Sequence, residues 1–180
     1  MRKITEIIIH CAATKPDFMP GATTAERIAE VRRWHVEDNG WSDIGYHYLI
    51  DRDGTRRTGR DLDRTGAHVK DHNTGTIGIC LFGGHGSAAT DRFEEHFTPE
   101  QDQALRALLH ELQMRFGVLV KVTGHNQYAA KACPGFDVPT WLAAEHVAAP
   151  EPAEDQTDYV RMRWRMAAIR DAAIAALEEG

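Results

Sequence analysis

Apolar residues fall into several short runs along the chain, and the β-branched and aromatic character of these runs predicts strands. The run at 4–11 (ITEIIIHC) is rich in isoleucine, and the run at 76–82 (TIGICLF) is apolar almost throughout, as in a buried strand. Residues 46–51 (YHYLID) predict another strand, which leads into a tight turn at 52–55. The set of predicted strands is completed by two weaker segments, 56–58 and 118–123.

Other segments show the three- and four-residue spacing of amphipathic helices. Residues 23–38 open with a threonine and a glutamate three positions apart, which is the sequence pattern of a capping box. Residues 98–117 open with Thr-Pro-Glu-Gln and end at a glycine, so both ends of this helix are marked. A short helix is expected over 137–147. The polar, glycine-containing stretches 59–75 and 83–96 are expected to be loops.

Strands and helices alternate in this pattern, which favours an α/β fold with a central mixed β-sheet flanked by helices. We expect one domain over residues 1–147. Residues 148–156 (AAPEPAEDQ) hold two prolines and three acidic residues and predict a linker. Residues 157–180 predict a C-terminal helix that packs within the chain, dimerises, or touches an anionic membrane surface through its arginines.

Composition narrows the classes of function. The 180 residues are 42% apolar and carry a net charge of −6, and this acidic balance argues against nucleic-acid binding. No apolar stretch is long enough for a transmembrane helix or a signal peptide, so we expect the chain to be made and held in the cytoplasm. Three cysteines without a secretion signal argue against a disulfide scaffold.

Three residues form a candidate zinc site. His10 ends the isoleucine-rich strand, His125 follows the last predicted strand, and Cys133 lies in the loop-like string KACPGFD. Catalytic zinc needs three protein ligands and one open position, and two imidazoles with one thiolate satisfy that need. Lys131 adds a cation two residues before the cysteine. Cys11 is excluded from this site because neighbours on a strand point to opposite faces.

The other cysteines and histidines have simpler interpretations. Cys80, inside an apolar run, is expected to be a buried strand residue. Five further histidines are expected on helix surfaces or in polar loops: His35, His85, His96, His110 and His146. From spacing alone, zinc and a purely structural role for the three candidate ligands remain open alternatives.

Several longer strings resemble one family. They are IIIHCAATKP (7–16), VRRWHVEDNGWSDIGYHYLIDRDGT (31–55), GAHVKDHNTGTIGICLFGG (66–84), HFTPEQ (96–101) and KACPGFD (131–137). In this order they resemble the phage-type, T7 lysozyme-like N-acetylmuramoyl-L-alanine amidases of the amidase_2 and peptidoglycan recognition protein superfamily. The resemblance covers roughly residues 4–142, and residues 148–180 have no counterpart in it.

The resemblance implies a function and a set of site residues. Zn²⁺ is expected on His10, His125 and Cys133, with Tyr46 and Lys131 as the catalytic residues. His68 and Asn73 are expected to line the substrate groove. The implied reaction is hydrolysis of the amide between N-acetylmuramic acid and L-alanine of peptidoglycan. The implied setting is a phage endolysin of Gram-negative hosts, held in the host cytoplasm until it is released to the periplasm.

Three alternatives stay open. A non-catalytic peptidoglycan-binding module is disfavoured because Cys133, Lys131 and Tyr46 are all present. A cysteine peptidase built on Cys133 is disfavoured by the proline that follows it and by the lack of a helix N-terminus beside the thiol. A cytosolic amidase that recycles muropeptides fits the same residues but is less similar to the family described.

Overall fold

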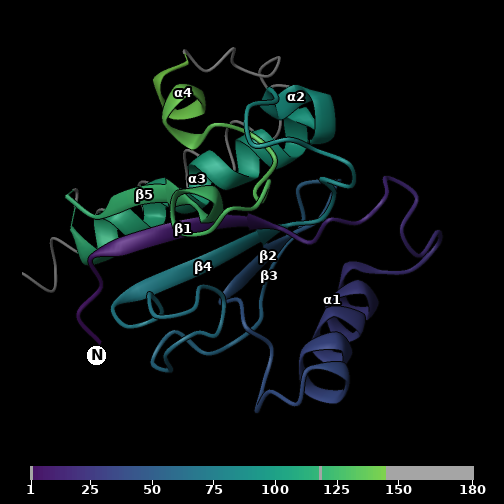
Figure 1. The fold of residues 1–180 in the computed structure, drawn as a ribbon, viewed down its shortest axis with the longest axis horizontal. Coiled ribbons are helices and arrows are strands. Elements are labelled where there is room, and N and C mark those ends of the chain that lie inside the picture. Colours follow the sequence, from purple (N-terminus) through teal and green to yellow (C-terminus); the bar gives the residue numbers. More distant parts are fainter. Residues whose placement is uncertain (1, 118, 145–180) are drawn as a thin grey trace, which may run out of the picture. The chain divides into compact units, whose positions relative to one another are not determined.

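The computed structural model describes residues 2–117 and 119–144, which form one mixed sheet with helices on both faces (Figure 1). The strand order is β3-β2-β4-β1-β5, and every neighbouring pair is parallel except β2 with β3. The strands are β1 (Glu6–Cys11), β2 (Tyr48–Ile50), β3 (Arg56–Thr58), β4 (Thr76–Leu81) and β5 (Lys121–Gly124). The expected α/β fold with a central mixed sheet is therefore confirmed.

Helices cover the two faces unequally. Figure 1 shows α2, α3 and α4 on one side of the sheet and α1 on the other. The helices are α1 (Thr24–Arg33), α2 (Phe93–His96), α3 (Pro99–Phe116) and α4 (Val138–Ala143). A π-helical turn, Trp34–Asp38, continues α1, and a 3₁₀ turn, His125–Gln127, follows β5.

Two apolar clusters correspond to the two faces of the sheet. The larger cluster packs alternate residues of β1 and β4, such as Ile9 and Ile79, against leucines of α3. The smaller one joins Ile28 and Val31 of α1 to residues of β2 and β4. The smaller cluster fills only part of its face of the sheet. Polar side chains occupy the rest of that face, and the candidate site lies among them.

The helix starts follow from their side chains. Thr23 and Glu26 form the predicted capping box of α1, and Thr98 and Gln101 form that of α3. Gln101 is fully buried, and its side-chain amide also donates hydrogen bonds to the carbonyls of Ile50 and Phe82. The start of α3 is therefore tied to the strands that it covers.

Several expectations need correction. The segment 83–96 was expected to be a loop, but it contains α2, whose four residues are too few to show helical periodicity. The strand expected at 118–123 begins only at Lys121, and α4 ends at Ala143 rather than 147. The expected linker (148–156) and C-terminal helix (157–180) lie outside the described residues.

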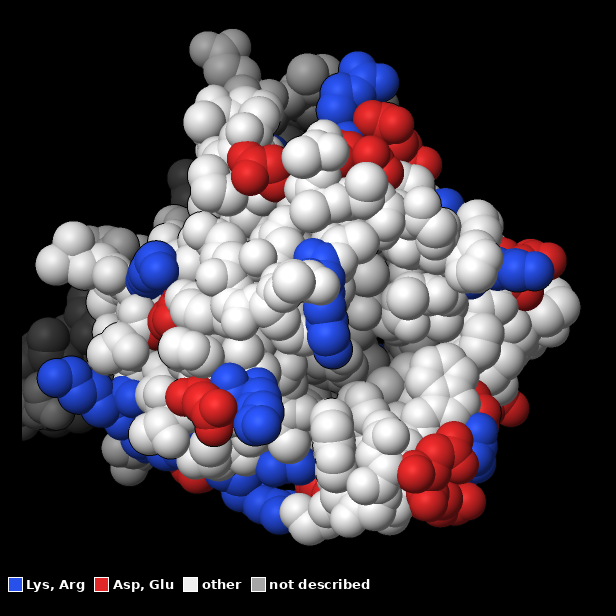
Figure 2. Space-filling view, viewed as in Figure 1, with Lys and Arg blue, Asp and Glu red and all other residues white. Residues whose placement is uncertain are grey.

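Charged side chains of both signs are scattered over the face drawn in Figure 2. A basic side chain lies near the middle of a broad, otherwise uncharged area on this face, and acidic and basic side chains lie together towards its edges. Within the residues that the structure describes, none of the helices is both long and apolar enough to span a membrane.

Candidate functional site

The three candidate ligands, far apart in sequence, come together in space. The metal-binding atoms of His10, His125 and Cys133 all lie within 4.8 Å of one another. The distance from His10 Nδ1 to Cys133 Sγ is 3.8 Å. Ligands at ordinary Zn–N and Zn–S bond lengths in a tetrahedral site are separated by about 3.6 Å, so the spacing fits one shared metal ion.

The sheet register brings the two histidines together. β1 and β5 are parallel neighbours, and Ile9 is paired with Gly124. His10 and His125 therefore follow at adjacent positions, and their ring centroids lie 4.7 Å apart. His10, near the end of the inner strand β1, is fully buried, whereas His125, just past the end of β5, is partly exposed.

Cys133 reaches the site on a loop that folds back against β1. The backbone N–H of Cys11 donates a hydrogen bond to Cys133 Sγ, with 3.3 Å between the two atoms. Fully buried Phe136 anchors the end of the loop in the larger apolar cluster. The side chain of Cys11 belongs to that cluster and is not among the clustered metal-binding groups found in the described residues.

Burial sets the protonation of these groups. The pKa of His10 is well below its ordinary value, chiefly because the imidazole is buried and also because His68, His125 and Lys131 lie near it. Burial and Lys131 also lower the pKa of His125. Both rings are therefore neutral near pH 7, as metal ligands must be. The hydrogen bond with the Cys11 side chain, together with burial, raises the pKa of Cys133, so a metal must displace its proton.

Tyr46 and Lys131 lie close to these three side chains. The ring centroid of Tyr46 is 5.2 Å from that of His10, and Lys131 is exposed and close enough to lower the pKa of both histidines. Burial raises the pKa of Tyr46 well above its ordinary value, and Cys80 and Cys133 add to the effect. Its phenol is therefore a hydrogen-bond donor at neutral pH.

His68 and Asn73 lie beside the metal-binding cluster. They help to line a pocket of about 590 Å³ that also contains His125 and Lys131. Asn73 Oδ1 accepts the backbone N–H groups of His68 and Val69, so it shapes the turn that carries His68. His68 is only 7% exposed, and its Nδ1 is 3.0 Å from His10 Nε2.

Sequence reasoning missed the aromatic walls of this pocket. Trp41 is 39% exposed and stacks on His35, with 4.7 Å between the ring centroids, and Tyr128 lines the pocket near Lys131. The expectation that His35 lies on a helix surface is wrong, because it is buried and its Nδ1 accepts the N–H of Gly45. A tryptophan directly after Asn-Gly was the available signal for an exposed aromatic residue.

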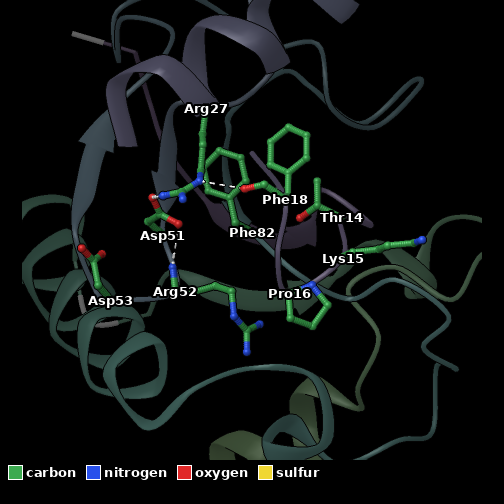
Figure 3. A pocket seen from close by; sticks show the side chains of 9 residues that line it. All are labelled: Thr14, Lys15, Pro16, Phe18, Arg27, Asp51, Arg52, Asp53 and Phe82. Carbon is green, nitrogen blue, oxygen red and sulfur yellow. Dashed lines mark hydrogen bonds and ion pairs between the residues drawn. The ribbon is translucent and has the colours of Figure 1, made fainter. Parts of the chain in front are cut away.

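A second pocket, of about 220 Å³, contains none of the predicted site residues (Figure 3). Its central charges are already paired: Arg27 donates to the buried carboxylate of Asp51 at 2.8 Å and to the carbonyl of Phe18 at 3.1 Å. These bonds tie the loop after β1 to α1 and to the end of β2. Because Arg27 and Asp51 are paired with each other, we interpret both as structural groups.

Comparison with known proteins adds independent findings. The sequence profile of the family Amidase_2, described as N-acetylmuramoyl-L-alanine amidase, matches residues 1–136. The endolysin of Klebsiella phage KP32 is 44% identical over 78% of this chain and 86% of its own length. The endolysin of Escherichia phage T7 is 43% identical over 75% of this chain and 83% of its own length.

A solved structure shares the fold. The N-acetylmuramoyl-L-alanine amidase LysC from Clostridium intestinale URNW aligns with a TM-score of 0.61 and 25% identity. The alignment covers 79% of this chain and 85% of that one. The resemblance expected from the sequence strings is confirmed by these matches.

Proposed function

The chain belongs to the Amidase_2 family of N-acetylmuramoyl-L-alanine amidases, and we propose that it hydrolyses the amide between N-acetylmuramic acid and L-alanine in peptidoglycan. We further propose that it does so as a phage endolysin. The single observation that carries the catalytic part is the convergence of His10, His125 and Cys133 within 4.8 Å beside a pocket. The endolysin relatives of Klebsiella phage KP32 and Escherichia phage T7 support the biological part.

Zinc is the metal that this donor set fits. Two neutral imidazoles and one thiolate are common zinc ligands, and three protein ligands leave one position open for chemistry. When bound, zinc supplies Lewis-acid chemistry, which acidifies water and polarises a carbonyl group. His10, His125 and Cys133 would hold it. Their side chains come from β1, the turn after β5, and the loop beyond that turn.

Lys131 stabilises the negative charge that develops on the carbonyl oxygen during attack. Its ammonium lies at the pocket wall and near both histidines, so its charge is already in place when the substrate arrives. Tyr46 acts as a hydrogen-bond donor that orients the reacting groups. A phenol whose pKa is raised is a poor general base at neutral pH.

The pocket beside the metal-binding cluster holds the substrate. Its volume of about 590 Å³ and its exposed Trp41 provide an apolar surface for a sugar or peptide segment. His68, Asn73, Tyr128 and Lys131 contribute to its lining. The scissile amide then lies between the Lys131 ammonium and the three metal-binding side chains.

The remaining parts of the proposal follow from the endolysin role. We propose that the catalytic domain spans residues 1–147 and that residues 148–180 are an appendage to it. The protein accumulates in the host cytoplasm, is released to the periplasm, and acts on the thin peptidoglycan of a Gram-negative host. The phage endolysins to which the chain is similar support this setting.

Product analysis tests the reaction. Purified Gram-negative sacculi are incubated with the protein, and the soluble products are identified by mass spectrometry. The proposal predicts stem peptides with a free L-alanine amino terminus and glycan strands without peptide. If the sacculi stay intact while the protein co-sediments with them, the chain is a binding module instead. Cleavage within the stem peptide would indicate a peptidase.

A further inference from the structure

His10 makes a second contact on the side of its ring that faces away from Cys133. Its Nε2 lies 3.0 Å from Nδ1 of His68, and both rings are buried. The other nitrogen of His68, Nε2, lies 3.2 Å from Oγ1 of Thr76, which is also buried. A candidate metal ligand, a second histidine and a threonine thus form one continuous chain of polar contacts.

The direction of these hydrogen bonds follows from counting protons. The Thr76 hydroxyl has one proton and lies 3.0 Å from each of two backbone carbonyls, those of His72 and Asn73, which can only accept. Thr76 therefore donates to a carbonyl and accepts the Nε2–H of His68. A neutral His68 with its proton on Nε2 has a free lone pair on Nδ1. That lone pair accepts the Nε2–H of His10.

The tautomer of His10 is fixed by this chain. With its proton on Nε2, His10 presents the lone pair of Nδ1 towards Cys133 Sγ, 3.8 Å away. The opposite arrangement would leave a proton on Nδ1, between the two candidate ligands, where the metal has to bind. A hydrogen bond from the non-ligating nitrogen also increases the basicity of the ligating one.

The ring of His68 is held in a fitted space between two glycines. A Cβ at Gly78 of β4 would lie 2.6 Å from His68 Cγ, and a Cβ at Gly66 would lie 2.5 Å from His68 Cδ2. Neither glycine has a positive φ, so the backbone does not require glycine at these positions. The lack of a side chain at Gly66 and Gly78 leaves room for the imidazole of His68 in this orientation.

We propose that His68 is a positioning residue that, with Thr76, fixes the tautomer and ring orientation of the metal ligand His10. This inference rests on the metal centre of the proposed function and deepens it. The proposal assigns His68 a role beyond contact with the substrate, because its Nδ1 is hydrogen-bonded to His10 within the protein. Outer hydrogen-bond partners of this kind commonly change metal affinity by about 10–100-fold when they are removed.

Two substitutions at one position test the role. His68→Leu replaces the imidazole with an apolar side chain of similar bulk and so removes the acceptor Nδ1. His68→Asn instead places an amide oxygen near the position of Nδ1. Zinc dissociation constants are measured on the purified full-length chain by competition with a chromophoric chelator. We expect His68→Leu to bind zinc about 10–100-fold more weakly and His68→Asn to recover most of the loss. His85→Leu, at an exposed histidine, serves as the matched control and should bind as the wild type does.

Nitrogen NMR of the imidazoles gives a second readout that does not depend on stability. In the zinc-loaded wild type, His10 should bind through Nδ1 and keep its proton on Nε2, and His68 should carry its proton on Nε2. Unchanged zinc affinity in a folded His68→Leu variant would overturn the proposal, as would ligation of zinc through His10 Nε2. Neither measurement uses peptidoglycan. A wild type that binds zinc in this way but leaves sacculi intact would therefore refute the proposed function and not this inference.

Discussion

The sulfur of Cys133 accepts a hydrogen bond from the backbone N–H of Cys11, with 3.3 Å between the two atoms. The preceding residue, His10, directs its Nδ1 at the same sulfur from 3.8 Å. Two successive residues of β1 thus contribute to the centre in different ways, one through its ring and one through its main chain. The strand alternation that turns the Cys11 side chain into the apolar core leaves its N–H available to the sulfur.

This relationship separates the roles of the two cysteines. Cys133→Ser should abolish stoichiometric zinc binding, because it removes the thiolate ligand. Cys11→Ala should retain zinc, because the backbone N–H that donates to the sulfur stays in place and the Cys11 thiol is not among the clustered metal-binding groups of the described residues. Metal content measured by mass spectrometry after dialysis against trace zinc distinguishes the variants. Equal loss of zinc in both would contradict this separation of roles.

Lys131 and Tyr46 should affect turnover without affecting metal binding. Lys131→Ala removes the cation that we propose stabilises the developing negative charge, and kcat should fall by about 100-fold or more. The matched control is Lys15→Ala, because Lys15 is an exposed lysine at the separate pocket of Figure 3 and should be dispensable. Loss of zinc from the Lys131 variant would contradict this division of roles.

Tyr46→Phe should lower kcat for the release of stem peptides from sacculi, while zinc stays bound. Because the pKa of Tyr46 is raised well above its ordinary value, the phenol stays protonated across the neutral range. The substitution should therefore lower the rate without removing a limb of the pH–rate profile. A neutral-range limb that disappears in Tyr46→Phe would identify the tyrosine as the titrating base.

The second pocket allows a prediction about stability. The side chain of Asp51 is only 3% exposed and is paired with Arg27, whereas the pair of Arg56 and Glu111 is much more exposed. Arg27→Met should destabilise the fold by about 3 kcal/mol, because it leaves a buried carboxylate without its cation. Arg56→Met should cost less than about 1 kcal/mol. Denaturant unfolding of both variants tests the contrast, and similar losses would contradict it.

Folding stability should decrease at acidic pH because of His47. This histidine is fully buried, and burial lowers its pKa to about 4. An unfolded histidine has a pKa near 6.5, so between these values the unfolded chain binds more protons and stability falls as the pH falls. The loss between about pH 7.5 and about pH 5.5 is roughly 1.3 kcal/mol from this residue.

Unfolding of the wild type and of His47→Asn at both pH values measures this contribution. A chelator is present throughout, so that release of metal does not add to the pH dependence. The variant should show a shallower dependence by about the same amount. If wild type and variant lose equal stability on acidification, His47 is not the source of the effect.

Local signals were sufficient for most of the fold. The pattern that starts at Thr98 and Gln101 predicted α3 because capping depends only on residues three positions apart. The isoleucine run of β1 predicted a strand for a similar reason. By contrast, the π-helical turn at Trp34–Asp38 and the four-residue α2 have no periodic signature of their own.

The candidate site was only partly accessible to sequence reasoning. His10, His125 and Cys133 were predicted as ligands from residue type, position at strand ends, and resemblance, and the structure brings them together. The contact between His10 and His68 spans 58 positions in the sequence. It depends on the glycine at position 78 of a neighbouring strand, which no local pattern reveals. Long-range side-chain geometry of this kind requires the folded structure.

The most direct test of the central claim is metal-dependent cleavage of sacculi, followed while zinc is removed and restored. The account predicts that stem peptides with a free L-alanine amino terminus cease to appear after chelation. Their release should return in proportion to zinc added, up to one ion per chain, and should not return in Cys133→Ser. Undiminished release of these peptides from protein stripped of metal would contradict the assignment of His10, His125 and Cys133 as the catalytic centre.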